Sequence, residues 1–124
     1  MTIIGLGAIG QAIVQRLAGF EVDTVGIRYT PSKGGPTDEV YGFEPDAVHH
    51  ALARSDYVVV ACPLTDVTRE LLGGAEFATM PPNAVVVNAA RGGVIDTDAL
   101  VAALQSGAIR GAALDVTDPE PLPG

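Results

Sequence analysis

The apolar positions of this sequence fall into two patterns that alternate along the chain. Short, nearly continuous apolar runs are typical of buried strands, whereas apolar residues that recur with helical spacing indicate helices. The runs predict strands at residues 2–4, 24–28, 57–61, 84–87 and 111–116, with a weaker strand at 40–42. The helical spacing predicts helices at residues 11–18, 45–52, 68–80 with a break at Gly73 and Gly74, and 97–106. This alternation predicts an α/β fold, a doubly wound parallel sheet in three layers, α/β/α.

Three residues at helix ends support these boundaries. Pro45 suits the first turn of a helix, where its missing N–H is not needed. Asp96 can cap the helix at 97–106, and Gly107 can end it in a left-handed conformation. Ligands of doubly wound sheets bind outside the carboxyl ends of the strands. We therefore expect a site among the residues that follow each strand.

A glycine-rich loop follows the first predicted strand and opens the first predicted helix. Gly5, Gly7 and Gly10 have the spacing G-x-G-x-x-G of dinucleotide-binding Rossmann domains. In that motif the first glycine permits a tight turn, the second admits a pyrophosphate close to the backbone, and the third lets the helix pack on the strand. The chain holds 15 glycines, so a purely structural turn is the alternative. The strand–loop–helix context favours a bound dinucleotide, with its pyrophosphate at the helix N-terminus.

The residue at the end of the second strand bears on the choice between NAD and NADP. NAD sites usually place Asp or Glu there, to accept hydrogen bonds from the ribose, but this chain has Arg28. An arginine can pair with a 2′-phosphate and stack on adenine, and further donors follow close by. These neighbouring residues are Tyr29, Thr30, Ser32 and Lys33. The sequence therefore favours NADP, and the alternative is a solvated arginine in an enzyme that uses NAD.

Composition narrows the class of protein. The 124 residues suffice for one domain with an ordinary apolar core. The formal net charge of −8 argues against nucleic acid and anionic membranes as partners, because both require a positive field. The single Cys62 can form no internal disulfide, and no leader or bilayer-length apolar run is recognisable, so a cytoplasmic protein is expected. His49 and His50 are neighbours on a predicted helix and point apart, so no metal site is predicted.

Three further segments, at residues 55–65, 80–96 and 113–121, resemble signatures of the D-isomer-specific 2-hydroxyacid dehydrogenases. Residues 55–65, SDYVVVACPLT, with Thr68 after them, are similar to the second signature of that family. Residues 80–96, MPPNAVVVNAARGGVID, resemble its third signature, and residues 113–121, ALDVTDPEP, resemble its aspartate and glutamate segment. With the glycine loop, these ordered blocks cover most of the chain. The resemblance implies an oxidoreductase that moves a hydride between NAD(P)H and a small 2-oxo or 2-hydroxy acid.

The resemblance also implies roles for individual residues. Arg91 would lie against the cofactor and hold the substrate's carboxylate and carbonyl, and Glu120 would orient a catalytic histidine. Asp115 would contact the nicotinamide carboxamide. The other residues expected to line the cofactor are Ala8, Ile9, Cys62, Pro63, Thr68, Ala89 and Ala90. Cys62 could also be interpreted as a nucleophile, but no basic partner accompanies it in the pattern, which favours a small buried residue at a strand end.

Two departures from the family pattern limit what this chain can do. Ala61 stands where the family often has histidine, which removes a polar cofactor contact. The family's catalytic histidine follows the last block and its substrate domain precedes the glycine loop, so both are expected outside residues 1–124. We therefore expect one dinucleotide-binding domain, part of a homodimeric enzyme and inactive by itself. The alternative is a dinucleotide-sensing regulator or corepressor on the same fold.

Overall fold

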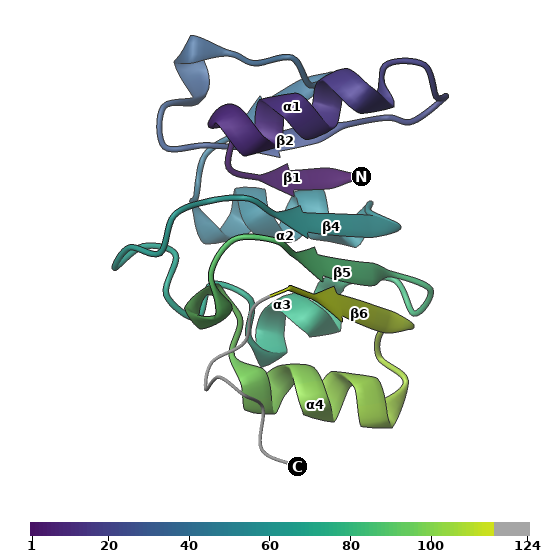
Figure 1. The fold of residues 1–124 in the computed structure, drawn as a ribbon. Helices are drawn as coiled ribbons and strands as arrows, with labels where there is room; N and C mark the ends of the chain where they lie inside the picture. Colours follow the sequence, from purple (N-terminus) through teal and green to yellow (C-terminus); the bar gives the residue numbers. More distant parts are fainter. Residues whose placement is uncertain (116–124) are drawn as a thin grey trace.

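The structure is a computed structural model that describes residues 1–115. Six strands in this part of the chain form one parallel sheet in the order β3-β2-β1-β4-β5-β6 (Figure 1). They are β1 (Thr2–Ile4), β2 (Val25–Ile27), β3 (Glu39–Tyr41), β4 (Tyr57–Val60), β5 (Val85–Asn88) and β6 (Gly111–Leu114). The strand order reverses at β1, which pairs with β2 on one side and with β4 on the other. The doubly wound sheet predicted from the sequence is therefore confirmed, and its switch point lies beside β1.

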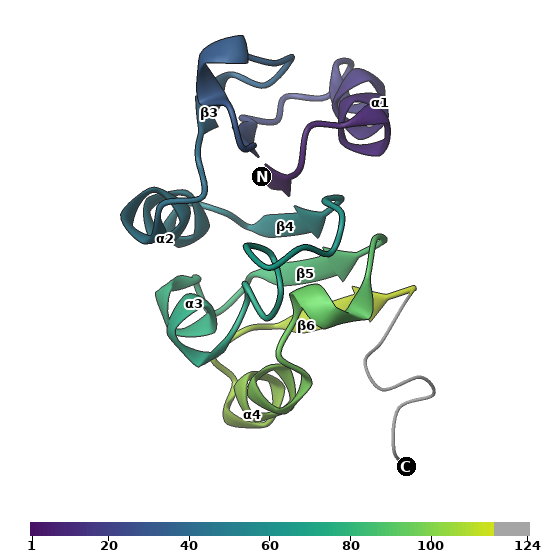
Figure 2. The ribbon, with the colours of Figure 1, turned by 90° about the vertical axis from the view of Figure 1, so that its left-hand side faces the viewer.

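Helices cover both faces of this sheet. The described residues form α1 (Ala8–Leu17), α2 (Pro45–Ala53), α3 (Gly74–Thr79) and α4 (Thr97–Ser106), together with the short 3₁₀ helices η1 (Pro31–Lys33) and η2 (Gly92–Val94). Figure 2 shows α1 on one side of the sheet, and α2, α3 and α4 on the other side. The three-layer α/β/α arrangement expected from the sequence is thus confirmed.

Side chains alternate across the sheet and so build two separate apolar cores. Ile3 and Val59 pack with Val14 of α1 on one face. Ile4 and Val60, their neighbours along the two strands, belong to the larger core beneath α2, α3 and α4. Because successive residues of a strand point to opposite faces, a strand covered on both sides is apolar at most of its positions. This is the physical origin of the continuous apolar runs in the sequence.

The residues predicted to limit two helices do so. Pro45 occupies the first turn of α2. The Asp96 side chain accepts a hydrogen bond from the backbone amide of Ala99 at 3.3 Å and caps α4. Gly107 ends α4 with a φ of 76°, in the left-handed region that favours glycine. These three local signals therefore predicted the ends of α2 and α4 correctly.

The predicted helix at residues 68–80 is wrong in its first half, because only α3 forms there. The residues before α3 make turns, and Glu70 has a φ of 50°. Their backbone donors are used elsewhere: the amide of Glu70 donates to the carbonyl of Gly93 at 2.7 Å, and that of Leu72 donates to Val94 at 3.1 Å. Amides that donate to a distant loop are not available for the hydrogen bonds of a continuous helix.

Candidate cofactor-binding site

The three glycines of the loop between β1 and α1 meet different surroundings. Gly5 has a φ of +101°, and a Cβ there would lie 2.7 Å from the Cα of Cys62. A Cβ on Gly10 would lie 2.0 Å from the carbonyl oxygen of Gly5. A Cβ on Gly7 would meet no atom within 4 Å, and its φ of −77° suits any residue. Packing therefore requires glycine at positions 5 and 10, whereas the space beside Gly7 is free for a ligand.

The N-terminus of α1 adjoins this free space. Gly7 is the residue before the helix, no side chain caps its amides, and the first turn contains no acidic residue. The Nε2 atom of Gln11 donates to the carbonyl oxygen of Leu6 at 2.8 Å, which holds the loop against the helix. The helix dipole and the amides of the first turn favour an anion at this place. The chain's own groups therefore fit the pyrophosphate of a dinucleotide.

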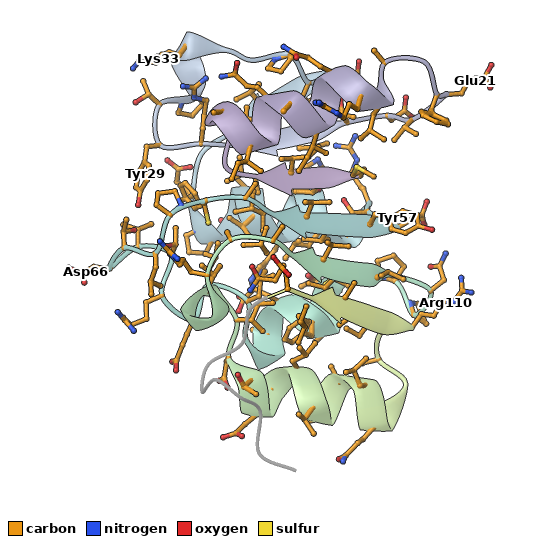
Figure 3. The ribbon with its side chains drawn as sticks, viewed as in Figure 1. Glu21, Tyr29, Lys33, Tyr57, Asp66 and Arg110 are labelled. Atoms are coloured by element: carbon orange, nitrogen blue, oxygen red, sulfur yellow. The ribbon has the colours of Figure 1, made fainter. Side chains whose placement is uncertain are left out.

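A first cavity, of about 240 Å³, lies between the ends of β1, β2 and β4. It is lined by Gly5, Leu6, Gly7, Arg28, Tyr29, Thr30, Lys33, Phe43, Cys62 and Pro63. The Nη1 atom of half-buried Arg28 donates to the carbonyl oxygen of Gly34 at 2.7 Å, so part of its guanidinium fork holds the loop after β2. Figure 3 shows Tyr29 and Lys33 at the edge of the sheet where β1 and β2 end. The structure thus brings together four of the five residues named for cofactor choice, Arg28, Tyr29, Thr30 and Lys33, whereas Ser32 is not part of this lining.

Two aromatic rings form one wall of this cavity. The rings of Tyr29 and Phe43 lie 4.9 Å apart between centroids, tilted by 46°. The Tyr29 hydroxyl is hydrogen-bonded to the hydroxyl of Thr65, which lies in the loop after β4. Sequence reasoning missed Phe43, although it is the second residue after β3 and so lies near a strand end, where the site was expected. An apolar, aromatic wall of this kind suits a planar base such as adenine.

A second cavity, of about 470 Å³, lies on the other side of the glycine loop, toward β5. It is lined by Gly7, Ala8, Ile9, Ala61, Cys62, Pro63, Ala89, Ala90 and Arg91. Gly7, Cys62 and Pro63 belong to the linings of both cavities, so the two adjoin at the start of α1. Arg91 is exposed and gives this second cavity a cation. The predicted residues Ala8, Ile9, Ala89 and Ala90 are brought together with it.

The charges of the chain are distributed unevenly around these cavities. The whole chain has a formal net charge of −8 and contains seven Lys and Arg residues. Three of the seven, Arg28, Lys33 and Arg91, line the two cavities. Among residues 1–115, no group of three or more His, Cys, Asp or Glu is arranged to hold a metal ion. The site is therefore suited to an elongated anion rather than to a cation.

Cys62 and Thr68 are buried residues at and after the end of β4. Cys62 is 2% exposed, as predicted for a small buried residue, and burial raises the pKa of its thiol to about 11. A protonated thiol at neutral pH is a poor nucleophile. Thr68 is fully buried, and its hydroxyl donates to the carbonyl oxygen of Pro63 at 2.7 Å and accepts from the amide of Thr65 at 2.8 Å. The structure thus places Thr68 outside both cavity linings, where it holds the loop after β4 in shape.

Two predicted residues lie beyond these cavities. Asp115 follows β6 at the same edge of the sheet, is exposed, and donates its backbone amide to the carbonyl oxygen of Asn88 at 3.0 Å. Glu120 lies outside the described residues. In the part of the chain that the structure describes, no helix is long and apolar enough to cross a membrane.

The fold and the site together define the class of protein, a Rossmann domain whose strand ends enclose a two-part cavity. Comparison with known proteins identifies the family. The model of the D-isomer specific 2-hydroxyacid dehydrogenase, NAD binding domain, matches residues 1–124. The chain therefore belongs to this family.

Alignments with relatives in the family extend over almost the whole chain. Human glyoxylate reductase/hydroxypyruvate reductase is 46% identical over 98% of this chain and 37% of its own length. Glyoxylate reductase of Thermococcus gammatolerans is 42% identical over 96% of this chain and 35% of its own length. The crystal structure of a D-isomer specific 2-hydroxyacid dehydrogenase from Xanthobacter autotrophicus Py2, in complex with NADPH and MES, matches with a TM-score of 0.90 and 41% identity over 99% of this chain and 50% of that one. The chain thus spans half or less of the length of each of these three proteins.

Proposed function

We propose that this chain is the cofactor domain of an enzyme that reduces a small 2-oxo acid with NAD(P)H. One observation carries the proposal: two adjoining cavities run from Arg28, past the free space at Gly7, to Arg91. This arrangement matches the order of an adenosine, a pyrophosphate and a nicotinamide along one cofactor. The relatives that are named for reducing glyoxylate and hydroxypyruvate support the class of substrate.

The residues of the chain divide the work between binding and catalysis. The wall formed by Tyr29 and Phe43 holds the adenine, and the amides at the start of α1 hold the pyrophosphate. A bound nicotinamide supplies the hydride. Arg91 binds the carboxylate of the 2-oxo acid, polarises its carbonyl and stabilises the negative charge that develops on the carbonyl oxygen. Glu120 orients the histidine that donates a proton, and this histidine lies elsewhere in the full-length protein.

The test of this role is the kinetics of the full-length protein with Arg91 replaced. Arg91→Lys keeps the charge but loses the bidentate fork, so we expect kcat/KM for glyoxylate or hydroxypyruvate to fall by about 100-fold. The Kd of NADPH should change little, because the pyrophosphate and adenosine contacts remain. Arg16→Lys, on the exposed side of α1, is the matched control. Wild-type protein that binds NADPH but reduces neither acid would contradict the proposal and favour a dinucleotide sensor.

We propose further that the cofactor is NADP rather than NAD. Arg28 lies at the end of β2 with its guanidinium turned toward the loop that carries Lys33, and both line the first cavity. These two cations can bind the 2′-phosphate together, whereas neither can accept a hydrogen bond from a ribose hydroxyl. The crystal structure from Xanthobacter autotrophicus Py2, in complex with NADPH, is consistent with this choice.

Replacing Arg28 tests the cofactor preference. Wild-type protein should bind NADPH more tightly than NADH, and Arg28→Asp should weaken NADPH by about 10- to 100-fold, the value of one or two charge-assisted hydrogen bonds. The same change should strengthen the binding of NADH, because aspartate accepts hydrogen bonds from the ribose hydroxyls. Titration of both cofactors by fluorescence measures this, and a wild-type preference for NADH would refute it. A homodimer stays a prediction of the family resemblance, and a cytoplasmic location stays a prediction from the sequence.

A further inference from the structure

Arg91 is carried by a short turn, and the side chain of Asn88 closes that turn. Asn88 is the last residue of β5 and is 1% exposed. Its Oδ1 atom accepts a hydrogen bond from the amide of Ala90 at 3.1 Å. Its Nδ2 atom donates to the carbonyl oxygen of Arg91 at 2.9 Å. One buried side chain thus bonds to two successive residues of the turn, and both of them line the second cavity.

The backbone of Asn88 fixes the base of the same turn. Asn88 lies in register between Val60 of β4 and Leu114 of β6. Its carbonyl oxygen accepts from the amide of Asp115 at 3.0 Å, and the amide of Ala89 donates to the carbonyl oxygen of Val60 at 3.3 Å. The sheet therefore holds the start of the turn on both sides. The direction in which the turn leaves the sheet then depends on the Asn88 side chain.

An asparagine is the residue type that this position requires. The side-chain amide offers one acceptor and donors on the same short stem, which matches one N–H and one C=O of the following backbone. The carbonyl oxygen of Arg91 has a second donor, the amide of Val94, but at the longer distance of 3.3 Å. A buried apolar residue at position 88 would leave the amide of Ala90 without this acceptor. Packing alone therefore does not explain a polar residue at this buried strand end.

We propose that Asn88 is a positioning residue for the substrate, acting through Arg91. Its two hydrogen bonds hold the turn so that the guanidinium of Arg91 meets the carboxylate and carbonyl of a 2-oxo acid in the second cavity. A displacement of the order of 1 Å at such a group costs about 100-fold in rate. The glycine loop, which binds the pyrophosphate, lies on a different strand and does not depend on Asn88. This inference rests on the proposed role of Arg91.

Two variants of the full-length protein test this role. Asn88→Ala removes both hydrogen bonds, and we expect kcat/KM for glyoxylate or hydroxypyruvate to fall at least about tenfold. The Kd of NADPH should stay within about threefold of the wild-type value, which also demonstrates that the variant is folded. Asn83→Ala is the matched control, because Asn83 is an exposed asparagine at the opposite end of β5. The control should match the wild type in both measurements.

Asn88→Asp adds a pH readout that a purely structural role would not give. The ionised carboxylate keeps the acceptor for Ala90 but has no donor for Arg91, whereas the protonated acid regains one donor. Burial raises the pKa of a carboxyl group at such a position. The ratio of the wild-type kcat/KM to that of Asn88→Asp should therefore shrink as the pH is lowered. A ratio that is constant with pH would count against the proposal.

A double-mutant cycle distinguishes a failure of the role of Asn88 from a failure of the proposed function. If Asn88 acts through Arg91, then Asn88→Ala should cause almost no further loss of kcat/KM in a protein that already carries Arg91→Ala. Additive losses, or a loss of NADPH affinity equal to the loss of kcat/KM, would overturn the role of Asn88 and leave the proposed function standing. Wild-type protein that reduces neither acid would instead overturn the proposed function, and the role of Asn88 with it.

Discussion

At the scale of single residues, the glycine loop separates the requirements of packing from those of binding. Gly5 and Gly10 have no room for a Cβ, and Gly5 also needs a positive φ. Gly7 has room, an ordinary φ, and a place in the linings of both cavities. A substitution at Gly10 should therefore lower the stability of the fold, and a substitution at Gly7 should weaken cofactor binding.

The contrast gives a prediction for the full-length protein. Gly10→Ala forces a Cβ to 2.0 Å from the carbonyl oxygen of Gly5, and we expect it to lower the free energy of unfolding by about 3 kcal/mol or to prevent folding. Gly7→Val should leave the melting temperature within a few degrees of the wild type and weaken NADPH binding at least about tenfold, because its side chain occupies the pyrophosphate position. Thermal melts and NADPH titrations measure both effects.

Gly19→Ala is the control for the glycine variants, because a Cβ on Gly19 also meets no atom within 4 Å and Gly19 lines neither cavity. It should change neither stability nor affinity. Equal NADPH affinity in wild type and Gly7→Val would contradict a pyrophosphate position beside Gly7.

Residue-level reasoning from the sequence succeeded where one local rule decides the outcome. The positions of Gly5 and Gly10 follow from a spacing, and that of Arg28 follows from the end of a strand. Thr68 could not be predicted in this way, because its burial depends on the course of the whole loop after β4. Asn88 was missed because its hydrogen bonds join backbone groups whose positions only the folded turn defines.

At the scale of elements, the segment before α3 illustrates a limit of periodicity. Residues 68–80 have helical spacing, but part of this segment forms a parallel bridge between Leu72 and Ile95. Hydrogen bonds to a segment more than twenty residues away decide its conformation, and no local pattern encodes them. The strands, by contrast, were predictable, because burial on both faces of the sheet produces nearly continuous apolar runs in the sequence.

A second feature at this scale joins two helices through a pair of side chains. The Nε2 atom of His49 on α2 lies 2.7 Å from Oε2 of Glu76 on α3. The Oε1 atom of Glu76 accepts from the amide of Gly73 at 3.0 Å, at the start of the same helix. Burial by itself raises the pKa of Glu76, but hydrogen bonds from His49 and Gly73 outweigh burial and hold the pKa below its ordinary value of 4.5.

This lowered pKa predicts a pH-dependent stability. A carboxyl group with a lowered pKa in the folded state contributes stability above its unfolded value, here 4.5, and loses it as the pH falls through the folded value. Glu76→Gln should therefore be less stable than the wild type above pH 4.5, by no more than about 1 kcal/mol because the pair is partly exposed. The gap should close as the pH falls below that value. Melting temperatures across acidic pH measure it.

Glu21→Gln serves as the control for this pair, because Glu21 is exposed, and Figure 3 shows it on the side of the molecule where the strands begin. Its melting curve should follow the wild type at each pH. A stability gap for Glu76→Gln that stays constant from neutral to strongly acidic pH would contradict the role given to the carboxylate.

At the scale of the whole molecule, basic residues and the carboxyl ends of the strands lie at the same edge of the sheet. The chain is acidic overall, yet three of its seven basic residues line the cavities where the strands end. The topology brings these strand ends together, because the order of the sheet reverses at β1. The sequence therefore predicted the fold and the edge of the sheet where the two cavities lie. It could not predict the sizes of the cavities, which depend on how the loops after β2 and β4 pack.

The proposed function requires a hydride to pass from the cofactor held by this domain to the carbonyl carbon of a 2-oxo acid. The direct measurement uses full-length protein, NADPH deuterated at C4 of the nicotinamide on the transferred side, and glyoxylate or hydroxypyruvate. Mass spectrometry and NMR of the product should find deuterium on C2 of the 2-hydroxy acid in stoichiometric amount. A 2-hydroxy acid formed without deuterium, or no 2-hydroxy acid from a protein that binds NADPH, would contradict the proposed function.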